Sequence, residues 1–430
     1  MRHEPIDPKL FVTHRSRLAE LLPDRSLAVV NANDILPTNA DGSLPLFPNA
    51  DLYYLTGVEQ EQSILLLAPQ AADPKMREIL FVRETNDLLK VWEGAKLTKD
   101  EATRVTGIAA VKWLDEFPAI FRKLMCEMEN VFLNSNEHPR AVVEIESRDA
   151  RFIRDCRAQY PLHHYHRLAP LLHRLRIVKS PEEVALMRRA IEATDAGLRR
   201  VMRFVKPGVY EHEVEAELIH EFTRRRCRFA YTPIVGSGAN SCVLHYIAND
   251  QPCKRGDVLL LDVGAAYANY NADLTRTIPV SGRFSRRQKQ VYNAVLRVQR
   301  ASIAGAVVGK LPADWLREAQ ALMNEELLRL ELLKPADIKK QSPDEPACRK
   351  YFPHGLGHPL GIDVHDVGNT HEPMAAGWVM TVEPGIYIPD EGLGIRLENN
   401  ILVTDNGPVD LTADIPLEAD EIEELMQQGK

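Results

Sequence analysis

Apolar residues recur at two different spacings along the 430-residue chain, and each spacing predicts one kind of element. A recurrence at every third or fourth position is typical of an amphipathic helix, and it occurs over residues 8–22, 99–105 and 141–160. Short apolar runs bounded by polar residues predict buried strands, and they occur at 26–30, 63–67 and 79–82. Strands and helices that alternate in this way favour an α/β layer for the first part of the chain.

The pattern changes near residue 175, where a long helix begins with clear start signals. Ser180 can cap the helix, Pro181 fits its first turn, and the two glutamates that follow complement its positive end. We therefore place a domain boundary there, with an N-terminal domain over residues 1–175 and a C-terminal domain over 176–430. Two domains also suit the length of the chain, because a single core rarely serves so many residues.

Beyond this boundary, short apolar strands carry an acidic residue at or near their ends. Such segments occur at 259–263, 379–383 and 394–398. Glycine and proline punctuate the chain around them, which is typical of turns. This half therefore predicts a curved, mostly antiparallel sheet covered by helices, two of which we expect at 181–204 and 286–305.

Composition narrows the classes of function. Hydrophobic residues make up 45% and charged residues 27%, so both domains can fold as globular protein. The net charge of −8, without a basic tract beside aromatic residues, argues against nucleic-acid binding. The first ten residues lack the apolar stretch of a secretory signal, and no apolar run is long enough to span a membrane. Six cysteines without a C-x-x-C pair predict reduced thiols, and together these features predict a cytoplasmic protein with no membrane or nucleic-acid partner.

Four carboxylates beside apolar strands carry the candidate chemistry. Asp262, Glu383 and Glu398 each follow an apolar segment, and Asp273 comes eleven residues after Asp262, across a polar turn at 267–271. A hairpin across that turn would bring the two aspartates together. Ionised carboxylates are costly to bury without a partner, and the neighbouring strands offer few cations of their own. We therefore interpret these carboxylates as metal ligands.

A group of histidines framed by glycines supplies the second part of the candidate site. His354, His358 and His365 fall within twelve residues, between glycines that let the backbone come close to a ligand. Other histidines lack such a setting and are interpreted as core or surface residues: His163, His164, His166, His212 and His220. One histidine with four carboxylates makes an oxygen-rich site suited to manganese, iron or cobalt. Four carboxylates also exceed the charge of one divalent ion, so we expect two ions with carboxylates between them.

These motifs resemble those of the pita-bread metallopeptidases, and most closely the Xaa-Pro aminopeptidases (aminopeptidase P). Six stretches that span nearly the whole chain carry the resemblance: Asp51–Gly57, Pro233–Asn240 with His245, Leu261–Thr277, His354–His365, Val382–Tyr387 and Gly394–Glu398. The resemblance implies an N-terminal aminopeptidase P-like α/β domain followed by a catalytic pita-bread domain of the creatinase and aminopeptidase kind. It also implies an exopeptidase that releases the N-terminal residue from peptides with proline in second position.

The resemblance further assigns roles to individual residues. Two divalent ions, with Mn²⁺ expected first, would be held by Asp262, Asp273, His358, Glu383 and Glu398. Asp273 and Glu398 would serve both ions, and Glu383 would also move a proton of the attacking water. His245 and His365 would contact the substrate carbonyl and its developing oxyanion. The pocket for the proline ring would be lined by His354, Tyr387 and Arg396.

Two alternative functions remain open at this point. The stretch from His354 to Pro359 resembles prolidases, the Xaa-Pro dipeptidases, as much as it resembles aminopeptidase P. Residues 92–95 also depart from the aminopeptidase P pattern, which leaves the length of the substrate open. A pita-bread protein that binds partners and has lost catalysis is the other alternative, and the intact set of five ligands disfavours it. A homo-oligomer, either a dimer or a tetramer, is also expected.

Overall fold

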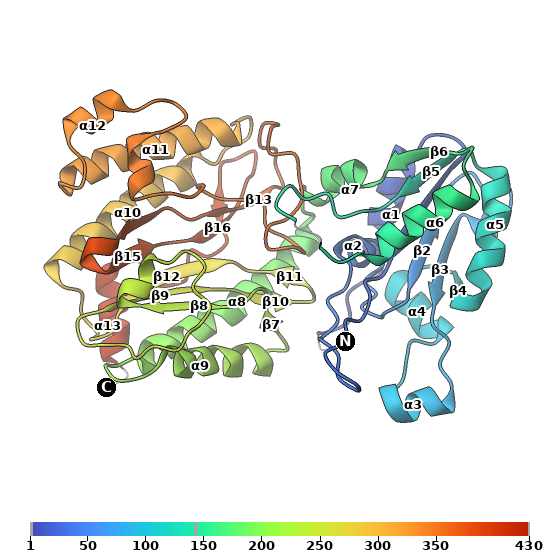
Figure 1. The fold of residues 1–430 in the computed structure, drawn as a ribbon, viewed down its shortest axis with the longest axis horizontal. Helices are drawn as coiled ribbons and strands as arrows, with labels where there is room; N and C mark the ends of the chain where they lie inside the picture. Colours follow the sequence, from blue (N-terminus) through green and yellow to red (C-terminus); the bar gives the residue numbers. More distant parts are fainter. Residues whose placement is uncertain (1–2, 142–143, 429–430) are drawn as a thin grey trace. The chain divides into compact units, whose positions relative to one another are not determined.

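The computed structural model describes residues 3–141 and 144–428, and the chain divides between Arg176 and Ile177 into two compact units (Figure 1). Each unit combines sheets with covering helices, so the predicted α/β class is confirmed. Over the described ranges, every helix is too short or too polar to cross a membrane. All six cysteines lie in these ranges, and their thiols are free.

The first unit is built around one mixed sheet. Its helices are α1 Lys9–Leu21, α2 Ala50–Thr56, α3 Asp87–Glu93, α4 Lys99–Thr106, α5 Phe117–Glu127, α6 Arg148–Gln159 and α7 Ala169–Arg176. Its strands are β1 Ser26–Asn31, β2 Ile64–Leu67, β3 Glu78–Val82, β4 Ala110–Trp113, β5 Asn130–Leu133 and β6 His164–Arg167. They lie in the order β4-β3-β2-β1-β5-β6, with β2 antiparallel to both of its neighbours and the other pairs parallel.

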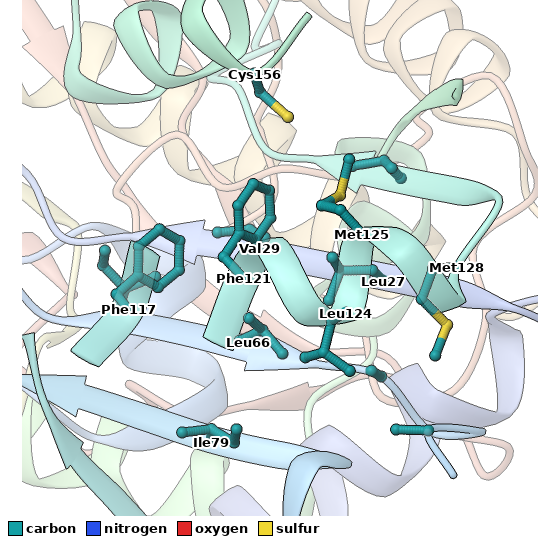
Figure 2. Packing of buried hydrophobic residues seen from close by; sticks show 14 of the residues in the cluster. Leu27, Val29, Leu66, Ile79, Phe117, Phe121, Leu124, Met125, Met128 and Cys156 are labelled. Atoms are coloured by element: carbon teal, nitrogen blue, oxygen red, sulfur yellow. The ribbon is translucent and has the colours of Figure 1, made fainter. Parts of the chain in front are cut away.

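The core of this unit lies between α5 and the sheet (Figure 2). Phe117, Phe121 and Leu124 recur at helical spacing, so they share the buried face of α5. They belong to one cluster with Leu27 and Val29 of β1, whose side chains point to the same face of the sheet. Each fully buried apolar side chain of this kind contributes roughly 1.5–3 kcal/mol to folding.

One predicted helix of the first unit differs from the structure. The helix expected over 141–160 begins only at Arg148, because the Ser147 side chain accepts a hydrogen bond from the Ala150 N–H and caps it there. Residues 142 and 143 of the expected helix lie outside the described residues. The apolar periodicity on which the prediction rested therefore extended beyond the real start of the element.

The second unit pairs short antiparallel strands under long helices. Its helices are α8 Pro181–Phe204, α9 Glu211–Arg224, α10 Arg286–Gly305, α11 Pro312–Arg329, α12 Pro335–Lys340 and α13 Ala419–Gln427. Its strands are β7 Arg228–Phe229, β8 Ile234–Ser237, β9 Val258–Val263, β10 Ala265–Tyr267, β11 Tyr270–Asn271, β12 Leu274–Pro279, β13 Val379–Val382, β14 Gly385–Ile388, β15 Leu393–Arg396, β16 Asn399–Leu402 and β17 Val409–Asp410. Every strand pairing recorded among these strands is antiparallel, as predicted.

Two long helices cover these strands (Figure 1). Helix α8 packs on β10 and β11, and α10 packs on β13, β14 and β15. The start of α8 is a complete capping box, in which Ser180 and Glu183 satisfy each other's backbone N–H groups. The candidate residues lie in these strands and in the loops that join them.

Candidate active site

A hairpin brings the two candidate aspartates together. Asp262 lies on β9, which pairs with β12 so that Asp262 is opposite Thr275, two residues after Asp273. The hairpin β10–β11 between them turns at Ala268 and Asn269, whose φ angles of 49° and 60° are both positive, as a tight two-residue turn requires. The predicted hairpin is therefore present, and its turn lies within the predicted segment.

Glycine allows the close packing on which this hairpin depends. A Cβ atom on Gly264 would lie 1.9 Å from the carbonyl oxygen of Ala272, next to Asp273. A Cβ atom on Gly357 would lie 2.0 Å from the Thr381 carbonyl oxygen, next to His358. A larger residue at either place would have to push apart backbones that hold a ligand.

The two glutamates lie directly after paired strands. Glu383 separates β13 from β14, and Glu398 separates β15 from β16. The Glu398 N–H donates to the Thr275 carbonyl oxygen at 3.0 Å, and the Thr275 hydroxyl donates to Glu398 Oε2 at 2.7 Å. Arg276, which is fully buried, donates to the carbonyl oxygens of Glu398 and, 140 residues along the chain, Pro416, both at 2.7 Å. These bonds fix Glu398 against the strand beside Asp273.

The hydrogen bonds of His358 leave one ring nitrogen facing the carboxylates. Its Nδ1 atom lies 2.9 Å from the carbonyl oxygen of Pro359, which can only accept, so Nδ1 carries a proton. In the neutral ring, Nε2 then has a lone pair, and it lies 3.4 Å from Asp273 Oδ2 and 3.8 Å from Glu383 Oε1. A backbone carbonyl that fixes the tautomer is the usual setting of a metal-binding histidine.

Three of the predicted ligands form a compact donor set. Asp273, His358 and Glu398 each offer an atom such that all lie within 4.8 Å of one another. Glu383 lies at the edge of this set through its contact with His358, and Asp262 through a shared partner, Tyr231. Carboxylate oxygens with one imidazole nitrogen are the donors that hard or borderline divalent ions prefer. The residues present therefore fit the expected metal ions.

Burial crowds negative charge into this site. Burial is the largest cause that raises the pKa of Asp273 and, well above its usual range, that of Glu398, and the carboxylates around them add to it. Burial likewise raises the pKa of Glu383 to about 7. Burial lowers the pKa of His358, but its hydrogen bond to Asp273 and the nearby carboxylates outweigh this and raise it to about 8. Divalent ions bound here would offset this crowded negative charge.

Tyr231 is a site residue that the sequence analysis missed. Its hydroxyl lies 2.6 Å from Asp262 Oδ1 and 2.5 Å from Asp273 Oδ1. One hydroxyl has one hydrogen, so it can donate to only one of these oxygens unless the other carboxyl group is protonated. Burial, followed by the charges of the two aspartates, raises the pKa of Tyr231 well above 10, so the hydroxyl keeps its proton. Tyr231 thus orients both aspartates.

Arg396, Tyr387 and His354 form a chain of hydrogen bonds behind Asp262. Arg396 binds Asp262 through Nη2, donates from Nη1 to the Tyr387 hydroxyl at 2.8 Å, and donates from Nε to the Thr275 hydroxyl at 3.2 Å. The Tyr387 hydroxyl lies 2.8 Å from His354 Nε2, while His354 Nδ1 lies 2.8 Å from the Gly355 carbonyl oxygen. Burial lowers the pKa of His354 to about 4, so its ring is neutral and Nε2 accepts from the tyrosine.

His365 stacks on His358. The two rings are 3.8 Å apart between centroids and inclined by 25°. The loop that carries them is fixed from two sides: Asn271 donates from Nδ2 to the carbonyl oxygen of Ile362 at 2.6 Å, and Lys179 donates to Asp366 Oδ2 at 2.8 Å. Lys179 and Asp366 form a buried ion pair, with each side chain 1% exposed. The structure therefore places His365 beside the candidate ligands.

His245 lies apart from the carboxylates. It is exposed and follows the short 3₁₀ helix Gly238–Cys242. Among the sequence-predicted residues it interacts with His354, whose imidazole it affects electrostatically. Its neighbours Leu244 and Tyr246 point inward and pack against a cluster that contains Tyr387.

Comparison with known proteins supports, along nearly the whole chain, the resemblance to the Xaa-Pro aminopeptidases that the motifs indicated. A sequence profile described as metallopeptidase family M24 matches residues 185–405, and one described as aminopeptidase P, N-terminal domain, matches residues 11–132. The Xaa-Pro aminopeptidase of Escherichia coli (strain K12) is 33% identical over 433 residues, which cover 97% of each chain.

Solved structures of aminopeptidase P support the same resemblance. Zinc-substituted E. coli aminopeptidase P in complex with product is similar with a TM-score of 0.86 at 32% identity, over 99% of this chain and 100% of that chain. E. coli aminopeptidase P with the inhibitor Pro-Leu is similar with a TM-score of 0.86 at 32% identity, over 99% of both chains. The similarity covers both units of the chain.

Proposed function

The chain belongs to metallopeptidase family M24, and from this premise we propose that it is a metal-dependent Xaa-Pro aminopeptidase. The observation that carries the proposal is the donor set itself: Nε2 of His358 faces a group of buried carboxylates that lie near the ends of paired strands. A purely structural cluster of this kind would be expected to contain a matching set of basic side chains. The names of the similar proteins supply the substrate class.

Two divalent ions, with Mn²⁺ as the first candidate, would be held by Asp262, Asp273, His358, Glu383 and Glu398. When bound, such ions polarise a carbonyl group and make water more acidic. The predicted roles of Asp273 and Glu398 in serving both ions fit their position at the centre of the donor set. Two divalent ions would also balance the negative charge of the four carboxylates.

Protein groups handle the proton and the oxyanion. Glu383, whose pKa burial raises to about 7, can take a proton from water near neutral pH and deliver it to the leaving proline nitrogen. His365 is stacked on His358, and an imidazole there can donate to the oxygen that gains charge during attack. His245 would contact the substrate carbonyl from the pocket side, and Glu383 with these two histidines forms the proposed catalytic group.

The proline ring would lie against Tyr387 and His354, whose hydrogen bond to each other leaves apolar ring surfaces. Arg396 supports this wall from behind, because its guanidinium is buried and committed to Asp262, Tyr387 and Thr275. A dipeptidase needs a basic group for the free carboxylate of its terminal proline. Arg396, the candidate for that task, is already engaged, which favours an aminopeptidase over a prolidase.

A comparison of substrate lengths also favours an aminopeptidase over a prolidase. Pro-Leu, the inhibitor in the E. coli structure, is also the dipeptide that cleavage of Xaa-Pro-Leu would release. By transfer to this chain, we expect Ala-Pro-Leu to be cut at least as efficiently as Ala-Pro, compared by kcat/KM. Ala-Ala-Leu is the matched control for the proline requirement.

The test uses protein stripped with chelator and reloaded with Mn²⁺. Activity on Ala-Pro-Leu should disappear on stripping and return with the metal, and Asp273→Asn should abolish it. Asp420→Asn, a change at an exposed carboxylate, is the control and should leave it unchanged. Full activity in protein shown by elemental analysis to lack metal would overturn the proposal. Cleavage of Ala-Pro alone would move the assignment to a prolidase. The oligomeric state and the cellular compartment stay predictions.

A further inference from the structure

A buried glutamate lies outside the candidate ligands and contacts the loop that carries His245. Glu211 is the first residue of α9, and it is fully buried. Its side chain reaches away from its own helix and into the loop over residues 238–251, which we call the His245 loop. Its carboxylate binds both ends of this loop.

Five hydrogen bonds reach the two oxygens of Glu211. Just before the loop, Ser237 at the end of β8 donates from its backbone N–H and its hydroxyl to Oε1, both at 2.7 Å, and Asn240 within the loop donates from Nδ2 to the same oxygen at 3.3 Å. At the end of the loop, the Tyr246 hydroxyl at 2.7 Å and the Gln251 N–H at 3.0 Å donate to Oε2. One side chain thus closes the loop.

All of these donors are neutral, which distinguishes Glu211 from the ion-paired glutamates of this chain. A buried carboxylate is stable in such a setting only when several N–H and O–H groups satisfy it together. Its position in the first turn of α9 adds the favourable end of the helix dipole. The arrangement therefore depends on the loop keeping this conformation, and the loop depends on the carboxylate.

Glu211 is not the residue that caps α9. Glu213 has that function, because its Oε2 accepts from the Tyr210 N–H at 2.6 Å in the capping box. The Glu211 carboxylate instead accepts hydrogen bonds from residues 237–251. Two glutamates in one helical turn thus have separate tasks, one local and one toward the loop.

The link to His245 runs through Tyr246, the next residue in the chain. Tyr246 binds Glu211 and packs, with Leu244, against the cluster of Ile234, Leu260 and Tyr387. The residues on either side of His245 are therefore both anchored on the inner side, which leaves His245 directed outward, where it is exposed. We propose that Glu211 is a positioning residue that fixes the His245 loop and thereby sets His245 for the reaction. This inference rests on the proposed function of His245.

The test compares Glu211→Gln with Glu213→Gln, its matched control on the same helix turn. Glutamine keeps the size of the side chain but replaces one acceptor oxygen by an NH₂ group, so at least one N–H of the loop loses its partner. With Ala-Pro-Leu as substrate, Glu211→Gln should lower kcat by about 10- to 100-fold, the range expected when a catalytic group is displaced by about 1 Å. The metal content should not change. Glu213→Gln should stay within about two-fold of the wild type, since it leaves the loop untouched.

A double-mutant cycle separates positioning from general stability. If Glu211 acts through His245, then Glu211→Gln should lower kcat by less than about two-fold in a His245→Ala background. An equal loss in both backgrounds, or a parallel loss of metal, would overturn the proposal. Tyr246→Phe removes one donor and leaves the carboxylate in place. It should give a smaller loss that also vanishes without His245, and it serves as the readout if Glu211→Gln fails to fold.

Hydrogen–deuterium exchange tests the loop without using activity. Residues 238–251 should exchange faster in Glu211→Gln than in Glu213→Gln, while residues 258–277 should be unchanged. If the wild-type protein cuts no Xaa-Pro peptide, the proposed function fails, and exchange alone then decides whether Glu211 holds the loop. Unchanged exchange in residues 238–251 would overturn the inference in either case.

Discussion

Replacement of Lys179 by methionine should destabilise the second unit strongly. Lys179 and Asp366 are 2.8 Å apart between Nζ and Oδ2, and each side chain is 1% exposed. Methionine keeps most of the apolar stem and removes the charge, so buried Asp366 loses the ion pair with Lys179. Breaking a buried pair by removing one partner costs about 3–5 kcal/mol of unfolding free energy, because the remaining charge keeps its desolvation penalty. That range corresponds to a fall of roughly 10²- to 10³-fold or more in the folding equilibrium constant.

Urea unfolding followed by tryptophan fluorescence measures this loss. Trp378 is buried and forms a β-bridge with Val178, next to Lys179, so its emission reports on this part of the fold. The control is Lys289→Met, whose partner Asp420 is 78% exposed and whose loss should change stability little. Removing both charges with Lys179→Met and Asp366→Asn should recover part of the loss. A loss below about 1 kcal/mol for Lys179→Met, or one no larger than that of the control, would refute the reasoning.

Three further predictions follow from the site. In metal-free protein, folding raises the pKa of Glu383 from 4.5 to about 7 and that of His358 from 6.5 to about 8, so the stability should fall as the pH rises from about 5 to about 8. With Mn²⁺ bound, the Tm should decline less across this range, and an equal decline would contradict the prediction. His358→Ala should lose metal, whereas His365→Ala should keep its metal and lose kcat, and the reverse pattern in elemental analysis and kinetics would show that the two roles are exchanged. Gly264→Ala should lower both Tm and metal affinity, because its Cβ would lie 1.9 Å from the Ala272 carbonyl oxygen; an unchanged Tm would show that the hairpin relaxes freely.

The acidic candidate ligands stand out in the sequence because they break a strong rule. A carboxylate within or just after an apolar strand is costly to bury, which draws attention to Asp262, Glu383 and Glu398 in a single sequence. The hairpin to Asp273 followed from a polar turn between two apolar runs, and the observed turn with two positive φ angles lies within that segment. His358 could be placed near them only through the resemblance, because the glycine-framed segment contains three histidines.

The supporting residues gave no such signal. Tyr231 and Thr275 lie in ordinary strand-like sequence, where a hydroxyl is unremarkable, and their acidic partners are up to 123 residues away along the chain. Glu211 has the sequence position of a common first-turn glutamate, which normally faces solvent. Its burial depends on five donors that only the folded loop brings together. Long-range hydrogen bonds of this kind leave no periodicity to detect.

The hydrogen bonds of Arg276 have a consequence for how the enzyme is made. Its guanidinium joins the backbone beside Glu398 to that of Pro416, which lies 140 residues further on than Arg276 itself. Because a chain emerges from the ribosome beginning with its N-terminus, the first unit can fold while the second is still being synthesised. The surroundings of Glu398 therefore stay incomplete until Pro416 has left the ribosome, well after Arg276 itself has emerged.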